Sequence, residues 1–398
     1  MKKRTVQNQS NIKMNNCKLV LNIIRDNQDA LISRADIVKI TKMSPTSITR
    51  IADQLMEFGL VQQAESVVNG SVGRNGIRLK VIDDAILTAG ISIDSDYINI
   101  CILNFRDLIT AGKQIKLRKR PYQPEEIVKI AHAAFVELCL ESGYEIKKIM
   151  AVGISCIGNV DYETGTIYFA PQFQWENVEI GRLAEELFDQ PVFVDNDMKA
   201  SLVGLAHRHR DIKHEDVTYL SIGTGVGSAV MYGGALVRGS NNAAGEVGHV
   251  ILESSGRHCD CGQTGCVQTY LTKNSLIEQC QEEGHLITEV EQIYDSFRAR
   301  EEWAVSFVDR QARHLAMLLR NLVYMYNTRY ILVGGAIISD FPEFFHLASE
   351  KMRELMHENL FAGLTLELVK EKNNSTTGAA FMAQEYYIES LLFEEEQN

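Results

Sequence analysis

The sequence predicts an α/β protein in which a small winged helix-turn-helix precedes a larger body of alternating strands and helices. Two observations predict this fold class. The first 80 residues combine helix-capping residues with local positive charge, 13 Lys and Arg against 6 Asp and Glu, within a 398-residue chain of net charge −12. From about residue 85, strand patterns alternate with amphipathic helices, which is typical of sheets covered by helices. A basic module on an acidic body is expected where only the module contacts a polyanion, although charge alone is also compatible with chance surface variation.

Two helices are expected at the start of the basic module. The first spans residues 15–26. Ser33 is expected to cap a short second helix, because its hydroxyl can accept a hydrogen bond from a backbone N–H of the first turn. The apolar side chains expected to face inward, at the spacing of an amphipathic helix, are Leu19, Val20, Ile23 and Ile24 in the first helix and Ile37, Val38 and Ile40 in the second.

A third helix carries the expected DNA-reading face. Ser44 is a second N-cap, Pro45 occupies the first helical position, where its missing N–H costs nothing, and Gly59 ends the helix as a left-handed residue. Short hydrogen-bonding side chains and one Arg on its outward face suit base edges and phosphates in a major groove. The expected buried stripe is Ile48, Ile51, Leu55 and Met56. With one residue of the following hairpin, the predicted DNA-binding residues are Ser44, Thr46, Ser47, Thr49, Arg50 and Arg74.

The segment 60–81 predicts a two-stranded hairpin with a glycine-rich tip, the wing of a winged helix-turn-helix. Its basic residues Arg74, Arg78 and Lys80 are expected to lie along the phosphate backbone of DNA. Caps, turn, wing and local charge together favour DNA binding over the alternative interpretation, a small helical dimerisation domain.

Polar and glycine-rich clusters follow several strands of the body, where ligands bind in open α/β folds. The turn 222–227, "IGTGVG", lets backbone N–H groups approach an anion or a sugar ring. The segment "VDND" places Asp195, Asn196 and Asp197 after a buried strand. An Asp at this place suits proton abstraction from a substrate hydroxyl, and the same residues also suit a strand-to-helix turn with side-chain capping.

A glycine-rich loop holds three cysteines close together. Cys259, Cys261 and Cys266, preceded by His249, supply three thiolates and one imidazole, a common closed set for structural Zn²⁺. Thiolates select a soft or borderline metal over Mg²⁺ or Ca²⁺. The alternative is three reduced thiols beside a hydrogen-bonded His. The other cysteines fall in helix or strand patterns and are expected in the core: Cys17, Cys101, Cys139, Cys156 and Cys280.

The segment "GHVILESSGRHCDCGQTGCVQTY" resembles the signature of the ROK family, which comprises repressors, open reading frames and sugar kinases. The segments "VDNDMKA", "IGTGVGSAVMYGGALVRGSNNAAGEVGH" and "YILVGGAI" follow the family's order, so the resemblance covers most of the chain. It implies a two-lobed, actin-like or ribonuclease H-like body of the sugar-kinase type, with a sugar cleft between the lobes. It implies a structural zinc bound by His249, Cys259, Cys261 and Cys266. It also implies that sugar hydroxyls are contacted by Asn196, Asp197, Glu246 and His249. Carboxylate and amide groups suit this task, because each can hold adjacent hydroxyls.

The sequence departs from the family's pattern in two places. Those kinases usually carry Asp-x-Gly-Gly-Thr near the start of the body to hold the ATP phosphates, whereas Ser95, Asp96 and Tyr97 stand in that region here. Gln268, also expected to contact the effector, replaces a usual Glu, and an amide holds a hydroxyl less strongly than a carboxylate does. We therefore expect no enzymatic activity, with Asp197 a vestigial catalytic residue.

The expected function is a sugar-responsive DNA-binding transcriptional regulator, a repressor of carbohydrate-utilisation genes. Its expected partners are double-stranded operator DNA, a sugar or sugar-phosphate effector, a regulatory protein and further copies of the chain in a homodimer or homotetramer. The alternative is an ATP-dependent sugar kinase with Asp197 as general base. The sequence contains no apolar run of transmembrane length and no secretory signal, so a cytoplasmic protein without a membrane partner is expected. Three parts are expected: the winged helix-turn-helix in 1–82, a first lobe in 83–194 joined by the C-terminal helix 378–398, and a second lobe with the zinc loop in 195–377.

Overall fold

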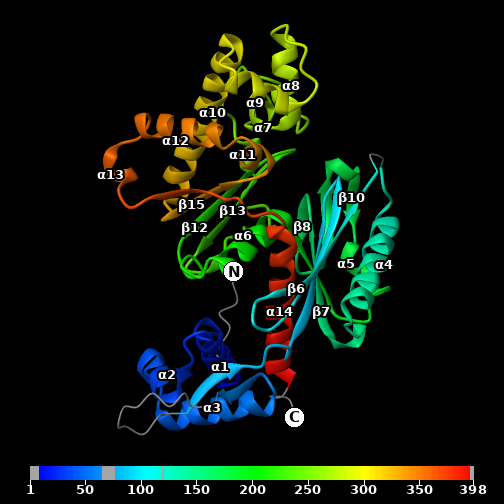
Figure 1. The fold of residues 1–398 in the computed structure, drawn as a ribbon, viewed down its shortest axis with the longest axis vertical. Coiled ribbons are helices and arrows are strands. Elements are labelled where there is room, and N and C mark those ends of the chain that lie inside the picture. Colours follow the sequence, from blue (N-terminus) through cyan, green and yellow to red (C-terminus); the bar gives the residue numbers. More distant parts are fainter. Residues whose placement is uncertain (1–8, 65–76, 119–120, 395–398) are drawn as a thin grey trace. The chain divides into compact units, whose positions relative to one another are not determined.

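The computed structural model describes residues 9–64, 77–118 and 121–394 (Figure 1). The chain divides into two compact units. The first unit comprises Met1–Gly158, Tyr162–Asp195 and Thr376–Asn398, and the second comprises Asn159–Asp161 and Asn196–Ser375. No helix in the described ranges is both long enough and apolar enough to cross a membrane.

The N-terminal part of the first unit contains three helices and a small sheet. The helices are α1 (Gln9–Asp26), α2 (Arg34–Thr41) and α3 (Pro45–Glu57), and the strands are β1 (Ile32–Ser33), β2 (Val61–Ala64) and β3 (Arg78–Val81), in the order β1-β3-β2. The Oγ of Ser33 accepts a hydrogen bond from the backbone N–H of Asp36, and Ser44 caps α3 by accepting from the N–H of Ser47 at 3.1 Å. Gly59 has a φ of +68°, so the residue expected to end α3 is left-handed. The two-residue strand β1, too short to give a sequence signal, was not expected.

The buried faces of α1 and α2 differ in part from the expected ones. In α1, Cys17, Val20, Leu21 and Ile24 are buried, whereas Leu19 is 46% exposed. The four buried positions follow i, i+3, i+4, i+7 spacing, and Leu19 falls outside that stripe. In α2, Ile37 is fully buried, but the prediction that Ile40 faces inward is wrong, because this side chain is 56% exposed. An eight-residue helix that packs mainly on α3 buries only a narrow stripe.

The rest of the first unit is built on a five-stranded sheet of order β11-β7-β4-β5-β6. Strand β4 pairs in parallel with β7 and antiparallel with β5. All residues of β4 are buried, as expected for a central strand covered on both faces. Figure 1 shows α14 on one side of this sheet and α4 on the other. The elements are β4 (Leu87–Ile93), β5 (Tyr97–Leu103), β6 (Ile109–Lys116), α4 (Pro124–Ser142), β7 (Ile149–Cys156), β9 (Thr166–Ala170), β10 (Trp175–Val178), α5 (Ile180–Glu185), β11 (Val192–Asn196) and α14 (Asn374–Glu394).

The second unit contains a five-stranded sheet of order β14-β13-β12-β15-β16 and most of the remaining helices. Its central strand β12 pairs antiparallel with β13 and in parallel with β15. Three consecutive helices, α8 (Lys273–Glu282), α9 (Val290–Arg298) and α10 (Glu302–Tyr326), follow the cysteine loop and α7 in the chain. The elements are β8 (Asn159–Asp161), α6 (Asp197–Arg208), β12 (Val217–Ile222), β13 (Val226–Tyr232), β14 (Ala235–Leu236), α7 (Gln268–Leu271), α8 (Lys273–Glu282), α9 (Val290–Arg298), α10 (Glu302–Tyr326), β15 (Tyr330–Gly334), α11 (Ala336–Asp340), α12 (Pro342–Glu354), α13 (Glu358–Phe361) and β16 (Thr365–Leu368).

Candidate functional site

The N-terminal half of α3 presents the polar residues that were predicted to read DNA. Thr46, Thr49 and Arg50 are exposed. Ser44 and Ser47 are engaged with each other, since their hydroxyl oxygens lie 2.9 Å apart and Ser44 also caps the helix. The side chains available to a partner at this end of α3 are therefore two threonines and one arginine, a set suited to a major groove.

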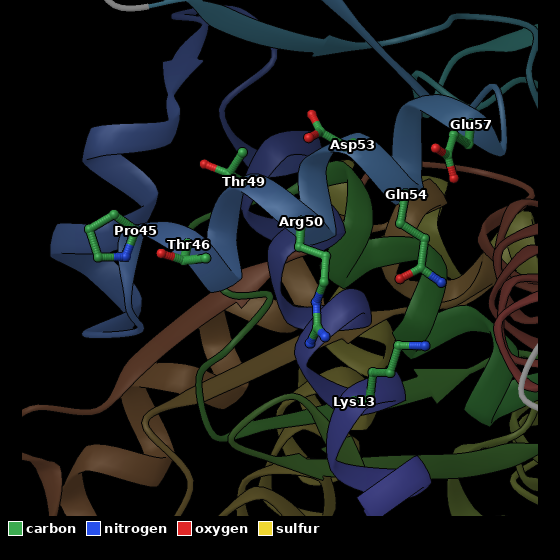
Figure 2. Close-up of a pocket in the computed structure, with 8 residues that line it drawn as sticks. All are labelled: Lys13, Pro45, Thr46, Thr49, Arg50, Asp53, Gln54 and Glu57. Atoms are coloured by element: carbon green, nitrogen blue, oxygen red, sulfur yellow. The ribbon is translucent and has the colours of Figure 1, made fainter.

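A pocket of about 750 Å³ lies along α3 and includes one residue of α1 (Figure 2). In Figure 2, Arg50 and Gln54 of α3 and Lys13 of α1 extend into the same space. Lys13 therefore adds a second cation to the pocket that the guanidinium of Arg50 lines. Sequence reasoning missed Lys13, because only the packing of α1 beside α3 brings the two residues together. The lining is completed by Pro45, Thr46, Thr49, Asp53 and Glu57.

The wing is described only at its base. Strands β2 and β3 pair antiparallel, with Val61 opposite Val81. Arg78 donates from Nη1 to the carbonyl oxygen of Ala30 at 2.9 Å, which ties the start of β3 to the turn after α1. Lys80 is exposed on β3. The predicted DNA-binding residue Arg74 lies outside the described residues.

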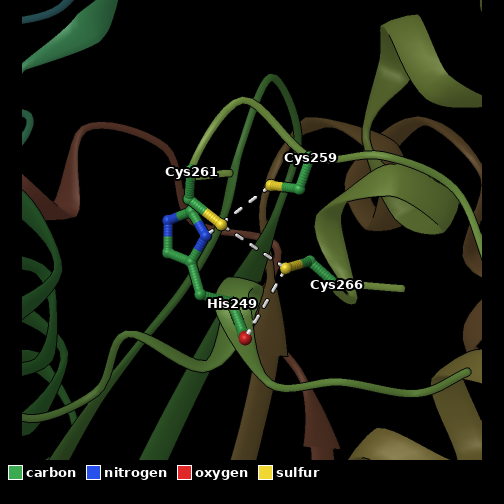
Figure 3. Close-up of side chains that lie close together, drawn as sticks. All are labelled: His249, Cys259, Cys261 and Cys266. Atoms are coloured by element: carbon green, nitrogen blue, oxygen red, sulfur yellow. Dashed lines mark hydrogen bonds between the residues drawn. The ribbon is translucent and has the colours of Figure 1, made fainter. Parts of the chain in front are cut away.

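The His and three cysteines of the glycine-rich loop converge in the second unit (Figure 3). One ligand atom from each of His249, Cys259, Cys261 and Cys266 lies within 4.8 Å of the others. The sulfurs of Cys261 and Cys266 are 3.6 Å apart, and the sulfur of Cys259 is 3.8 Å from Nδ1 of His249. These separations are too long for a disulfide, which needs about 2.05 Å. In a tetrahedral site with metal–sulfur bonds of about 2.3 Å, neighbouring ligand atoms lie about 3.8 Å apart. The two observed separations are close to that distance.

The thiols of this cluster have divergent proton affinities. A backbone hydrogen bond at Gln263 is the largest of the effects that lower the pKa of Cys261 to about 7. Burial raises the pKa of Cys266 to about 12. A divalent ion bound by the cluster would favour the thiolate form of both residues, because coordinated thiols deprotonate. Three sulfurs and one imidazole nitrogen therefore fit Zn²⁺ in both donor type and spacing.

The loop that carries the cysteines is anchored through Tyr270 of α7. The hydroxyl of Tyr270 donates to Glu253 at 3.0 Å and accepts from the backbone N–H of Arg257 at 3.1 Å. Gly265 has a φ of +82°, and a Cβ there would lie 1.7 Å from the carbonyl oxygen of Glu253, so this close loop crossing requires glycine. The hydroxyl of Thr269 donates to the carbonyl oxygen of Cys266 at 2.7 Å. The side chains that could hold a metal ion are thus carried by a loop with little room to rearrange.

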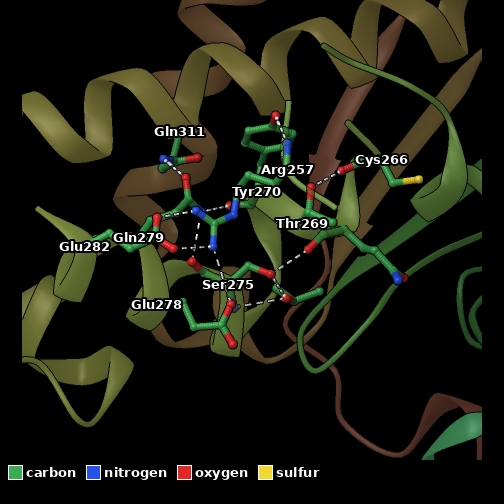
Figure 4. Close-up of polar contacts among 11 residues, drawn as sticks. Arg257, Cys266, Thr269, Tyr270, Ser275, Glu278, Gln279, Glu282 and Gln311 are labelled. Atoms are coloured by element: carbon green, nitrogen blue, oxygen red, sulfur yellow. Dashed lines mark hydrogen bonds and ion pairs between the residues drawn. The ribbon is translucent and has the colours of Figure 1, made fainter. Parts of the chain in front are cut away.

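Further polar contacts connect this loop to α8 and α10 (Figure 4). His314 of α10 lies 3.1 Å from Glu253 through Nε2 and 3.0 Å from Gln311 through Nδ1. The amide of Gln311 donates to Gln279, whose own amide donates to the carbonyl oxygen of Tyr270 at 3.1 Å. Burial lowers the pKa of His314 below its usual 6.5, more than the nearby Glu253 raises it. His314 is therefore part of a mostly buried polar network that supports the cysteine loop.

The predicted effector residues Asn196 and Asp197 lie at the start of α6. The Oδ1 of Asn196 caps α6 by accepting from the N–H groups of Met198 and Lys199 at 3.0 and 3.2 Å. The amide of Asn196 donates to Asp197 Oδ1 at 2.9 Å. Side-chain capping, one of the two interpretations of this segment, is therefore present. It leaves the partly exposed carboxylate of Asp197 in a fixed orientation.

Glu246, His249 and Gln268 occupy different surroundings. Glu246 is exposed, and His249 is part of the metal cluster described above. Gln268 donates from Nε2 to the sulfur of Cys259 at 3.2 Å. In this structure the amide of Gln268 is therefore directed at the metal cluster.

Lys199 is a buried residue of this region that sequence reasoning missed. Its side chain is 2% exposed and donates from Nζ to the carbonyl oxygens of Asn242 and Ala244, at 2.8 and 3.4 Å. These carbonyls belong to the loop that leads to Glu246. A single helix thus carries the capping Asn196, the carboxylate of Asp197 and a lysine that holds the neighbouring loop. A lone Lys in a helix pattern normally indicates a solvated face, so no local pattern indicates this role.

Comparison with known proteins supports the fold prediction. The family model described as the ROK family matches residues 88–386. The chain is 26% identical to the xylose repressor of Caldicellulosiruptor bescii, over 92% of this chain and 94% of the relative. A solved ROK family transcriptional regulator, described as a homologue of the Escherichia coli MLC protein, superposes with a TM-score of 0.81 at 21% identity, over 96% of this chain and 99% of that one. A ROK family glucokinase from Streptomyces griseus, solved with glucose and AMPPNP, gives a TM-score of 0.62 at 24% identity, over 75% of this chain and 99% of the kinase.

These likenesses confirm the predicted fold class: an N-terminal helical region followed by an α/β body of the sugar-kinase type. The regulator matches nearly the whole chain, whereas the kinase matches three quarters of it. The family match begins at residue 88, after the three N-terminal helices.

Proposed function

Since the chain belongs to the ROK family, we propose that it is a transcriptional repressor whose affinity for operator DNA is controlled by a sugar. In this proposal, residues 1–82 form the DNA reader. The effector-binding body has two lobes, one formed by residues 83–194 with 378–398 and the other by residues 195–377. The protein acts in the cytoplasm as a homodimer or homotetramer, with a regulatory protein as a further partner.

The observation that carries the proposal is the exposed polar end of α3. Thr46, Thr49 and Arg50 stand on a well-capped helix, and Lys13 lies beside them. A helix of a helix-turn-helix reads base edges with side chains of this kind near its N-terminus. The full-length likeness to a xylose repressor and to a ROK transcriptional regulator supports the same assignment.

The effector is proposed to bind on the second unit, at residues around the start of α6 and the cysteine loop. Asp197 and Glu246 supply carboxylates that can each hold adjacent hydroxyls, and Asn196 fixes the carboxylate of Asp197. A sugar or sugar phosphate is the chemical class that these groups suit. Gln268 and His249 complete the proposed effector set, with His249 oriented by its place in the metal cluster.

A structural zinc is part of the proposal. His249, Cys259, Cys261 and Cys266 would hold it. When bound, it supplies a closed cross-link that stabilises the loop and performs no reaction. The loop is also held by Tyr270 and Glu253, so that the metal adds to an arrangement the chain already favours.

A sugar kinase is the second candidate, since the partly exposed carboxylate of Asp197 at the start of α6 suits a general base and the kinases of the family share the fold. The turn between β4 and β5 opposes it. There the Asp94 carboxylate accepts from the N–H of Ser95, and the Asp94 N–H donates to the Tyr97 carbonyl oxygen. In the same turn the carboxylate of Asp96 stands where the kinases carry a glycine, which is unfavourable for a polyphosphate because like charges repel. We therefore assign no enzymatic activity to the chain.

Selection of duplexes from a random library by the full-length protein tests this function. The proposal expects enrichment of a sequence with two related half-sites, about one helical turn or a multiple apart, and loss of that enrichment in Arg50→Ala. The same preparation is assayed for ADP release with ATP and a panel of hexoses and pentoses. Absence of enrichment, together with turnover that Asp197→Asn abolishes, would replace the repressor by the kinase.

A further inference from the structure

We propose that Arg25 is a positioning residue that fixes the DNA-reading part of the chain to the C-terminal helix α14, and so sets the spacing of half-sites that the protein accepts. This inference rests on the proposed function for its DNA-binding consequence. The geometry that motivates it lies wholly within the first unit.

Arg25, near the end of α1, is 1% exposed and joins three elements. Its Nη1 donates to Glu385 at 2.8 Å, and its Nη2 donates to Gln384 at 2.6 Å, both on α14. Nη2 also donates to Asp107, in the turn between β5 and β6, at 2.8 Å. The guanidinium lies 5.0 Å from the ring centre of Phe105. A planar group with donors in fixed directions holds such partners in one orientation.

Two further features attach α1 to the same helix. Lys18, two turns before Arg25, lies 3.2 Å from Glu385 and 2.5 Å from Glu389. Ile388 and Leu392 of α14 belong to the apolar core that also contains the buried residues of α1, α2 and α3. Figure 1 shows the C-terminal half of α14 beside α1. The DNA-reading part therefore shares a core and ion pairs with α14.

The N-terminal half of α14 is fixed to the central sheet. The hydroxyls of Thr376 and Ser92 are 2.7 Å apart, and Thr88 donates to the carbonyl oxygen of Ala380 at 3.0 Å. A Cβ on Gly90 or Gly153 would lie about 2 Å from backbone oxygens of α14, so the helix sits directly on β4 and β7. Because α14 has 21 residues, it extends this attachment over about 30 Å, from the sheet to the DNA-reading part.

The path of the chain gives this attachment a regulatory meaning. The chain passes from the second unit, which carries the proposed effector residues, to the first unit between Ser375 and Thr376, at the start of α14. Helix α14 is held at one end by the sheet and at the other by Arg25. It therefore fixes the orientation of the DNA-reading part relative to the sheet, whereas a flexible linker would leave that orientation free. Arg25 is suited to this role because its directional contacts specify one geometry, whereas apolar packing alone tolerates several.

The test compares full-length Arg25→Met with Arg34→Met. Arg34 is the matched control, because its partner Asp53, at 2.7 Å, lies within the DNA-reading part itself. Hydrogen exchange is measured along the chain. Arg25→Met is expected to speed exchange in α1 and in residues 384–392 together, by about tenfold or more, whereas Arg34→Met leaves α14 unchanged. Equal protection of residues 384–392 in wild type and Arg25→Met would overturn the proposal.

The second readout is DNA binding as a function of half-site spacing, on a duplex selected by the wild-type protein. Wild type is expected to lose about tenfold or more in affinity when the spacing grows by half a helical turn. Arg25→Met is expected to keep its affinity for one half-site. When the spacing grows by half a turn, its affinity for the full duplex should fall by less than about threefold. The loss in Arg25→Lys should lie between those of wild type and Arg25→Met. If the affinity of Arg25→Met depends on half-site spacing as that of wild type does, the proposed role of Arg25 is contradicted. If wild type selects no duplex, the proposed function fails, and the exchange measurement alone decides the role of Arg25.

Discussion

The side-chain amide of Gln268 donates a hydrogen bond to the sulfur of Cys259 over 3.2 Å. This contact joins a residue expected to contact the effector to a residue of the metal cluster. A carboxylate at the same position could not donate, and it would place a negative charge beside the thiolates. The contact therefore links the stability of the metal cluster to the identity of residue 268.

Replacement Gln268→Glu is expected to weaken zinc binding by about tenfold or more, because outer contacts of metal ligands tune affinity by that amount. Competition with a chromogenic chelator measures the change. Gln263→Glu is the matched control, since this exposed side chain lies in the same loop. Equal zinc affinity in Gln268→Glu and wild type would show that the hydrogen bond to Cys259 does not support the metal.

Replacement Cys259→Ser is expected to reduce zinc from about one ion per chain to a small fraction and to lower the unfolding temperature, because structural zinc contributes folding energy. Elemental analysis of fresh protein and thermal unfolding measure the two effects. Cys280→Ser, at a buried cysteine of α8 outside the cluster, should lose stability without losing zinc. Wild-type protein purified without any zinc would remove the metal from the account.

Replacement Arg50→Ala is expected to weaken operator binding by about 1–3 kcal/mol if its guanidinium contacts a base. Fluorescence anisotropy at several salt concentrations measures the loss and distinguishes a base contact from a phosphate contact. The control is Arg313→Ala, an exposed arginine on α10 of the second unit. Unchanged affinity in Arg50→Ala would mean that the polar end of α3 does not read the operator.

Acid is expected to destabilise the protein through His314. Burial holds the pKa of His314 below 6.5 in the folded chain, so the unfolded chain binds this proton at higher pH. The contribution of neutral His314 is therefore fully present above about pH 6.5 and is lost as the pH falls. The unfolding temperature is measured from about pH 7.5 to about pH 5.5. If the unfolding temperature of His314→Gln falls with pH as steeply as that of wild type, His314 is excluded as a source of the pH dependence.

The features that could be predicted from the sequence are those fixed by residues close together in the chain. Ser44 and Gly59 mark the ends of α3 because capping depends on two or three neighbouring residues. The cluster of one histidine and three cysteines was likewise recognisable, since Cys259, Cys261 and Cys266 lie in one short loop. Strand and helix alternation gave the α/β body in the same way.

The features that could not be predicted depend on packing between distant segments. Arg25 and Gln384 are 359 positions apart, and no local pattern indicates that they meet. Lys199 resembles a solvated helix residue in the sequence, but it is buried and donates to the carbonyl oxygen of Asn242, 43 positions later. The inward orientation expected for Leu19 failed for the same reason, since the partners of α1 decide which stripe is covered.

The most direct measurement of the central claim is the affinity of the full-length protein for its selected duplex at one fixed salt concentration, with and without each sugar of a panel. The account predicts nanomolar to tens-of-nanomolar binding without sugar, of the order of specific DNA binders, and a loss of about tenfold or more with one sugar or sugar phosphate. That loss should be absent in Glu246→Gln, whose binding without sugar should equal that of wild type. Duplex affinity that no sugar alters, in a preparation that phosphorylates a sugar with ATP, would contradict the account.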